Sequence, residues 1–87
     1  MSTEILIIDD NADIRNILRD LISDAGYGTR IAANYNQALL EIDKKLPDVA
    51  IIDVKLDKGD NDGIELLNHI KKKNKDIPVI IISGHAN

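Results

Sequence analysis

Four segments of strand length divide this chain. Residues 5–8, 49–52 and 79–82 are continuous apolar runs, and residues 27–32 form a weaker fourth segment. Continuous runs, in contrast to alternating ones, are typical of parallel strands that are buried on both faces. Because helical patterns separate the four segments, the sequence predicts an α/β fold with a parallel sheet and right-handed crossovers.

The first helical segment has recognisable ends. Asn11 or Asp10 can cap its start, and Gly26 lies where a left-handed C-terminal cap is wanted. Its apolar residues recur at three- and four-residue steps, which predicts one buried stripe. The stripe consists of Ile14, Ile17, Leu18, Leu21, Ile22 and Ala25.

The second and third helical segments carry similar signals. Asn34 and Gln37 resemble a capping box that opens a helix through Lys45, and Asp62 caps the third helix. The second helix is expected to turn inward Ala38, Leu39 and Ile42. The third is expected to carry on one face Ile64, Leu67 and Ile70, with Leu66 at its edge.

Size and composition narrow the class of protein. The chain has 87 residues, enough for one domain, and it contains no cysteine, which excludes disulfides and thiolate metal sites. No apolar stretch approaches the roughly 20 residues of a membrane span, and no basic leader precedes the first strand, so we expect a cytoplasmic protein without membrane contact. A net charge of -4 and two tyrosines as the only aromatic residues argue against direct binding to nucleic acid.

Three acidic residues follow two of the strands. Asp9 and Asp10 come after the first strand, and Asp53 comes after the third. In a doubly wound sheet of order 2-1-3-4, these strands are neighbours and flank the switch-point crevice where such sheets bind ligands. Carboxylates held that close need a cation or a proton between them, and Mg²⁺ is the cation that oxygen ligands favour. Either Asp10 or Asp53 alone could be a helix cap or a polar strand end, but the three together favour a functional site.

The same residues carry a family resemblance. Four motifs, at residues 5–10, 49–53, 62–67 and 79–84, occur in this order along the chain. They resemble the receiver domain of bacterial two-component response regulators, and the similarity extends over the whole chain. The resemblance implies a flavodoxin-like doubly wound sheet and a non-enzymatic signalling role that depends on Mg²⁺.

The resemblance also assigns roles to individual residues. It implies that Asp53 accepts a phosphoryl group from a sensor histidine kinase, while Asp9 and Asp10 bind Mg²⁺ together with Asp53. The backbone carbonyl of Lys55 is expected to complete the protein ligands. Ser83, at the end of the fourth strand, is expected to sense the phosphoryl group by a hydrogen bond. The altered surface would then switch a downstream output, for which we expect transcription regulation.

The chain departs from the family pattern in two places. Receivers carry a lysine at the end of a fifth strand, whereas this sequence stops at Asn87, so residues 1–87 are expected to be the N-terminal part of a receiver without its fifth strand and last two helices. The open edge at residues 79–82 then predicts self-association. The loop after Asp53 has about two extra residues and Asp57 in place of the usual proline. This loop is similar to that of receivers of the nitrogen-regulation (NtrX-like) type, in which DNA contact would belong to downstream domains.

Other functions remain open at this stage. The missing lysine motivates a receiver-like interaction module that works without phosphorylation. A phosphatase of the Asp-x-Asp type is disfavoured because Lys55 occupies the position of the second acid. A dinucleotide enzyme is disfavoured because no glycine-rich turn follows the first strand.

Overall fold

A computed structural model describes residues 3–53 and 62–82 of the chain. Within them strands and helices alternate, as predicted. The elements are β1 (Glu4–Ile8), α1 (Ala12–Asp24), β2 (Gly28–Ala32), α2 (Tyr35–Lys44), β3 (Val49–Asp53), α3 (Asp62–Lys73) and β4 (Val79–Ile82).

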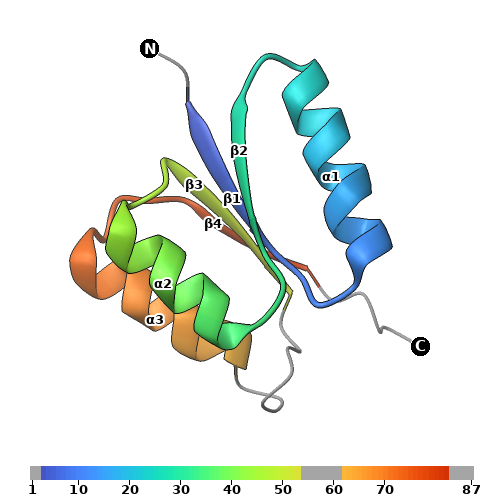
Figure 1. Cartoon of the computed structure of the whole chain (residues 1–87). Helices are drawn as coiled ribbons and strands as arrows, with labels where there is room; N and C mark the ends of the chain where they lie inside the picture. The colour runs from blue at the N-terminus through green and yellow to red at the C-terminus, as the bar shows by residue number, and fades with distance from the viewer. Residues whose placement is uncertain (1–2, 54–61, 83–87) are drawn as a thin grey trace.

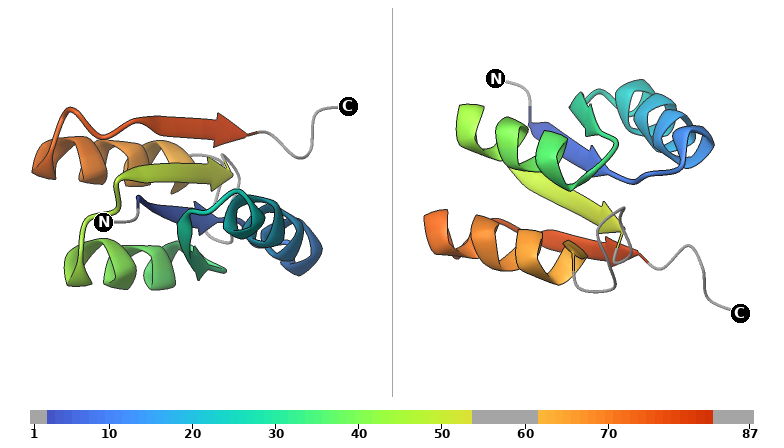
Figure 2. Two further views of the ribbon diagram at one scale, coloured as in Figure 1. Left: turned by 90° about the horizontal axis from the view of Figure 1, so that it is seen from above. Right: turned by 60° about the horizontal axis from the view of Figure 1, so that its bottom comes forward.

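The four strands form one parallel sheet in the order β2-β1-β3-β4, which confirms the predicted doubly wound topology. Helix α1 lies on one face of the sheet, and α2 and α3 lie side by side on the other (Figures 1 and 2). In the part of the chain that the structure describes, no helix combines the length and apolar character needed to cross a membrane.

The hydrophobic core lies between the sheet and the pair α2 and α3. Alternate positions of β1 and β3 face these helices, since successive strand residues point to opposite faces. The fully buried residues on this side are Leu6, Ile8, Ala32, Ala38, Ile42, Ala50, Ile52, Leu66 and Ile70. Each fully buried leucine or isoleucine stabilises the fold by about 1.5–3 kcal/mol, so this layer holds the sheet in position beneath the site.

The ends of α1 follow the sequence signals. Asn11 is the N-cap, and its Oδ1 accepts hydrogen bonds from the N–H groups of Asp13 (2.9 Å) and Ile14 (3.2 Å). Of the two predicted capping residues, the structure therefore selects Asn11 and leaves Asp10 free for another role. Gly26 has a φ of 99°, the left-handed conformation predicted for it.

The capping box of α2 is present in a modified form. Asn34 Oδ1 accepts the N–H of Gln37 at 2.8 Å, as predicted. The side chain of Gln37 bonds in return to the N–H of Ala33 at 2.8 Å, one residue before the cap. Helix α2 ends at Lys44, and Lys45 is its C-cap, within one residue of the predicted end.

The predicted buried stripe of α1 is only partly correct. No residue of α1 is fully buried. The row Ile14, Leu18 and Ile22 is half-buried, whereas Ile17 and Leu21 are 58% and 63% exposed. Helix α1 packs against β1 and β2. Residues four apart share one side of a helix, so the first row faces these strands and the second row points to one side of them, toward solvent.

The predicted inner face of α3 is only partly correct: Ile70 is buried as expected and Leu67 is half-buried, but Ile64 and Leu66 are misplaced. Leu66 and Ile70 are fully buried and Gly63 is buried beside them, while Ile64 is 41% exposed. The sequence allows two overlapping apolar rows, and packing against α2 and β3 selects the row of Gly63, Leu66 and Ile70. Asp62 is the first residue of the helix, where a carboxylate favours the helix dipole.

Arg30 joins β2 to the end of α2 and to β1. Its Nη1 donates to the carbonyl oxygen and to Oε1 of Glu41 (3.0 and 2.9 Å), and its Nη2 donates to the carbonyl of Lys45 (2.7 Å). Its Nε lies 3.0 Å from Oε1 of Glu4. Hydrogen bonds from Arg30 hold the pKa of Glu41 below its usual range. This pair therefore stabilises the fold above about pH 4.3, the ordinary pKa of Glu, and the contribution is lost as the pH falls through the lowered pKa.

We predict that Arg30→Met lowers the free energy of unfolding by about 1–3 kcal/mol at pH 7, because two carbonyls and the Glu41 carboxylate lose a charged donor and Glu4 loses its ion-pair partner. Urea unfolding measures the change, which should shrink below about pH 4.3. Arg19→Met is the matched control, since the Arg19 side chain is 41% exposed and pairs only loosely with Asp20 (3.4 Å). The two variants having equal stability would contradict the role given to Arg30.

Candidate functional site

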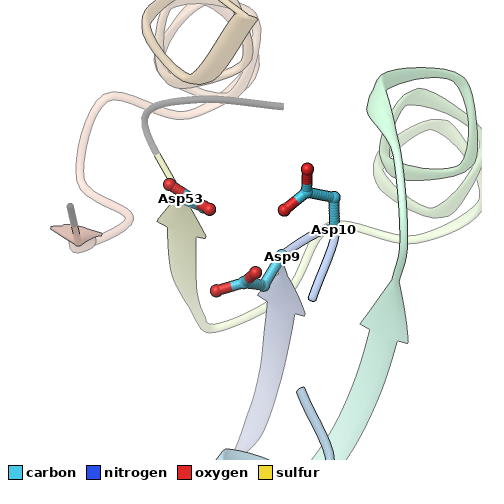
Figure 3. Close-up of side chains that lie close together, drawn as sticks. All are labelled: Asp9, Asp10 and Asp53. Carbon is cyan, nitrogen blue, oxygen red and sulfur yellow. The ribbon is translucent and has the colours of Figure 1, made fainter. Parts of the chain in front are cut away.

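The register of β1 against β3 brings two acids together. Ile8 of β1 pairs with Ile52 of β3, so the next residues along the two strands are Asp9 and Asp53. Asp10 follows on the turn into α1. Figure 3 shows the three side chains converging at the carboxyl ends of the strands. The sequence prediction that these acids meet at one edge of the sheet is confirmed.

The cluster formed by Asp9, Asp10 and Asp53 is compact and largely buried. One carboxylate oxygen from each residue lies within 4.8 Å of the others. Asp9 and Asp53 are buried, while Asp10 is exposed and leaves the cluster open to solvent on one side. Three carboxylates in such a space repel one another unless a cation or a proton neutralises part of the charge.

Asp9 is fixed through three of its polar atoms. Its N–H donates to the carbonyl of Ala32 (3.2 Å), and its Oδ1 accepts the N–H of Asn11 (2.8 Å). Its main-chain carbonyl accepts a hydrogen bond from Nη1 of Arg15 (2.8 Å). Its Oδ2 is buried and finds no hydrogen-bond donor among the residues that the structure describes. The side chain is therefore held in place with one oxygen left over for a ligand.

The electrostatics agree with this geometry. Burial raises the pKa of Asp9 above its usual value, and the nearby charges of Asp53 and Asp10 raise it further. The hydrogen bond from the N–H of Asn11 and the charge of Arg15 act in the opposite direction and lower that pKa. In the absence of a cation, the charged form of Asp9 is thus disfavoured in the folded state.

These residues fit a divalent cation with a preference for oxygen. A buried carboxylate oxygen without a donor costs about 1–3 kcal/mol or more, and a bound cation removes that cost. Carboxylates, carbonyls and water are the ligands of Mg²⁺, which usually binds one or two carboxylates and keeps several waters. The partly exposed cluster provides such carboxylates and room for water.

Two predicted site residues, Lys55 and Ser83, lie outside the described residues. Conversely, sequence reasoning missed the part that two other residues play at the site. Asn11 was predicted only as a helix cap, although its N–H also holds Asp9. Arg15 was not predicted at all. Its position four residues after the cap, where a helical side chain points back toward the N-terminus, is a signal that could have identified it.

The fold and the cluster together define a doubly wound α/β domain with an acidic site at its switch point. The profile of the response regulator receiver domain family matches residues 5–87, and the chain belongs to this family.

Individual relatives support the same assignment. The nitrogen assimilation regulatory protein NtrX of Azorhizobium caulinodans is 39% identical over 87 residues, which are 100% of this chain and 19% of the relative. Sporulation initiation phosphotransferase F of Bacillus subtilis is 39% identical over 86 residues, which are 99% of this chain and 68% of that protein. The predicted similarity to NtrX-like receivers is confirmed. This chain spans only 17–19% of the NtrX and NtrX-like relatives.

Solved structures show the same fold. NtrX from Brucella abortus, crystallised with ADP, superposes with a TM-score of 0.88 at 39% identity, covering 100% of this chain and 20% of that one. A CheY-like receiver domain protein from Methanospirillum hungatei has a TM-score of 0.90 at 29% identity, covering 100% of this chain and 68% of that one.

We predict that Asp9→Asn stabilises the metal-free protein at pH 7 by about 1–3 kcal/mol, since a buried charge with an unpartnered oxygen is replaced by a neutral group of the same shape. The pKa of Asp9 is raised in the folded state, so the ionised form lowers stability at high pH. The gain should therefore disappear as the pH falls below about 3.9, the ordinary pKa of Asp, because Asp9 is then protonated in both states.

Urea unfolding in EDTA at several pH values measures this effect. Asp20→Asn is the control, because Asp20 is exposed on α1 and away from the cluster. A metal-free Asp9→Asn variant that is less stable than the parent at pH 7 would show that the three acids do not repel one another.

Proposed function

We propose that this chain is a phosphoacceptor receiver module in which Asp53 accepts a phosphoryl group with the help of Mg²⁺. The observation that carries the proposal is the convergence of Asp9, Asp10 and Asp53, with one oxygen of each within 4.8 Å of the others at the carboxyl ends of β1 and β3. Membership of the receiver family supports the same role.

In this proposal each acid has a distinct task. Asp53, at the end of β3, is the nucleophile: its carboxylate oxygen forms a bond to phosphorus as the bond from phosphorus to the donor breaks. Asp9 and Asp10 would hold Mg²⁺ together with Asp53 and the carbonyl of Lys55. The bound ion would neutralise the acids and the phosphoryl oxygens, which a bare carboxylate cluster would repel. Because Asp53 is buried, only a small reactive group such as a phosphoryl group can reach its carboxylate.

The phosphoryl donor, the role of Ser83 and the output are inferred from the receiver family. The donor would be a phosphohistidine of a sensor kinase in the cytoplasm, and Ser83 would bind the transferred group. Similarity to NtrX supports transcription regulation as the output, with DNA contact made by other parts of a longer regulator. We also propose that residues 1–87 are the N-terminal part of a receiver, because they cover 68% of a CheY-like receiver protein.

We predict that the gene product containing these residues gains one phosphoryl group when incubated with acetyl phosphate and Mg²⁺, as measured by intact-protein mass spectrometry. Asp53→Asn should abolish the gain, because the amide has no nucleophilic carboxylate oxygen. Asp10→Asn should reduce Mg²⁺ affinity by roughly tenfold or more, as expected for loss of a metal ligand.

Asp24→Asn is the matched control, since Asp24 is exposed at the far end of α1 and should leave both readouts unchanged. Absence of a phosphoryl adduct on the parent protein would overturn the proposal. Mg²⁺ binding without an adduct would instead favour a receiver-like interaction module that works without phosphorylation.

We further propose that the 87-residue chain associates with itself through β4. This strand lies at one edge of the described sheet, next to β3 alone. Ile80 and Ile81 are 51% and 39% exposed, and as neighbours in a strand they point to opposite faces. An exposed apolar edge of this kind favours pairing with another chain.

The expected result is a mass above that of one chain in light scattering at high micromolar concentration. Ile80→Lys should lower the mass toward the monomer, because a charge on the edge opposes pairing. Leu40→Lys is the control, since Leu40 is also exposed but lies on α2. A monodisperse monomer across the concentration range would refute association through β4.

A further inference from the structure

Arg15 contacts the acidic cluster through a main-chain carbonyl and not through a carboxylate. Its guanidinium donates to the main-chain carbonyl of Asp9 (2.8 Å), and within the described residues it forms no ion pair with a carboxylate. The Nε of Arg15 is buried and also has no hydrogen-bond partner among the described residues. A half-buried guanidinium with so few bonds adds little stability, since an unpaired buried donor is itself unfavourable.

The carbonyl bond closes the turn between β1 and α1. The backbone N–H of Arg15 donates to the carbonyl of Asn11 (3.0 Å), which places Arg15 in the first turn of the helix. From there its side chain reaches back to Asp9, whose Oδ1 is held by the N–H of Asn11. The helix thereby fixes the main chain of Asp9 without using Oδ2, which has no donor among residues 3–53 and 62–82.

We propose that Arg15 is a positioning residue for the cation site: it holds the β1–α1 turn so that the carboxylates of Asp9 and Asp10 face Asp53 before the ion binds. This inference rests on the proposed Mg²⁺ function of the cluster. Because the guanidinium binds a carbonyl oxygen, it anchors the turn without occupying a carboxylate that the cation needs.

The sign of the effect separates positioning from simple electrostatics. Removal of a positive charge near three acids should by itself tighten the binding of a cation. Removal of the anchor should loosen the turn and weaken binding, as is typical when residues that orient metal ligands are lost. The two explanations thus predict opposite changes in Mg²⁺ affinity for Arg15→Met.

The test is a Mg²⁺ titration of the gene product containing these residues by calorimetry, with amide NMR shifts of residues 9–11 as a second readout. Arg15→Met is expected to raise the dissociation constant about tenfold. Arg15→Lys keeps a charge and a donor and should stay within about threefold of the parent, in line with partial replacement of the anchor. Circular dichroism and metal-free thermal unfolding establish that each variant is folded.

Arg19→Met is the matched control, because it removes the same charge one turn further along α1, where the side chain is 41% exposed. Its dissociation constant should be unchanged or slightly lower. If Arg15→Met does not fold, Arg15→Gln takes its place with the same expected loss, since the shorter neutral amide cannot replace the guanidinium.

A folded Arg15→Met or Arg15→Gln variant that binds Mg²⁺ as tightly as the parent, or more tightly, overturns the positioning role and leaves the proposed function intact. If the parent protein binds no Mg²⁺ and its titration is the same as that of Asp10→Asn, the proposed function is overturned together with this inference.

Discussion

Repulsion among three carboxylates at one edge of the sheet is the constraint on which the rest of this structure depends. Asp9 and Asp53 are buried beside each other, and burial together with neighbouring charge raises the pKa of Asp9. Such an arrangement lowers stability when no cation is present, so other interactions must hold it in place. The apolar layer between the sheet and the helices α2 and α3 provides that support. The site is therefore a local loss of stability that the core offsets.

The order of elements and the location of the acids could be predicted from the sequence. Continuous apolar runs identify buried parallel strands, and a parallel sheet places the residues that follow its strands at one edge. The predicted rows of α1 and α3 were less accurate. Leu66, expected at an edge, is fully buried, and Ile17, expected inside, is exposed. Helical periodicity shows which residues share a side, but the neighbouring elements decide which side is covered.

The hydrogen bonds that hold Asp9 in place could not be predicted from the sequence, for a different reason. Asn11 and Arg15 act on Asp9 through main-chain groups, an N–H and a carbonyl oxygen, and not through side-chain complementarity. A sequence identifies side chains, whereas every residue except proline offers the same pair of main-chain groups. Which main-chain atom a side chain reaches depends on the path of the turn.

The alignment of β1 with β3 also affects how the protein folds. At the opposite end of these strands, the N–H of Glu4 donates to Oδ2 of Asp48 (2.7 Å), and the N–H of Asp48 donates to the carbonyl of Glu4 (2.8 Å). These contacts join residues 44 positions apart in sequence, and such non-local pairings form slowly compared with helices. A slip of one residue would turn every side chain of one strand to the other face, and Asp53 would no longer lie beside Asp9. The acidic site thus cannot exist in a partly folded chain until this pairing is complete, and an ion that needs all three acids would bind only after that step.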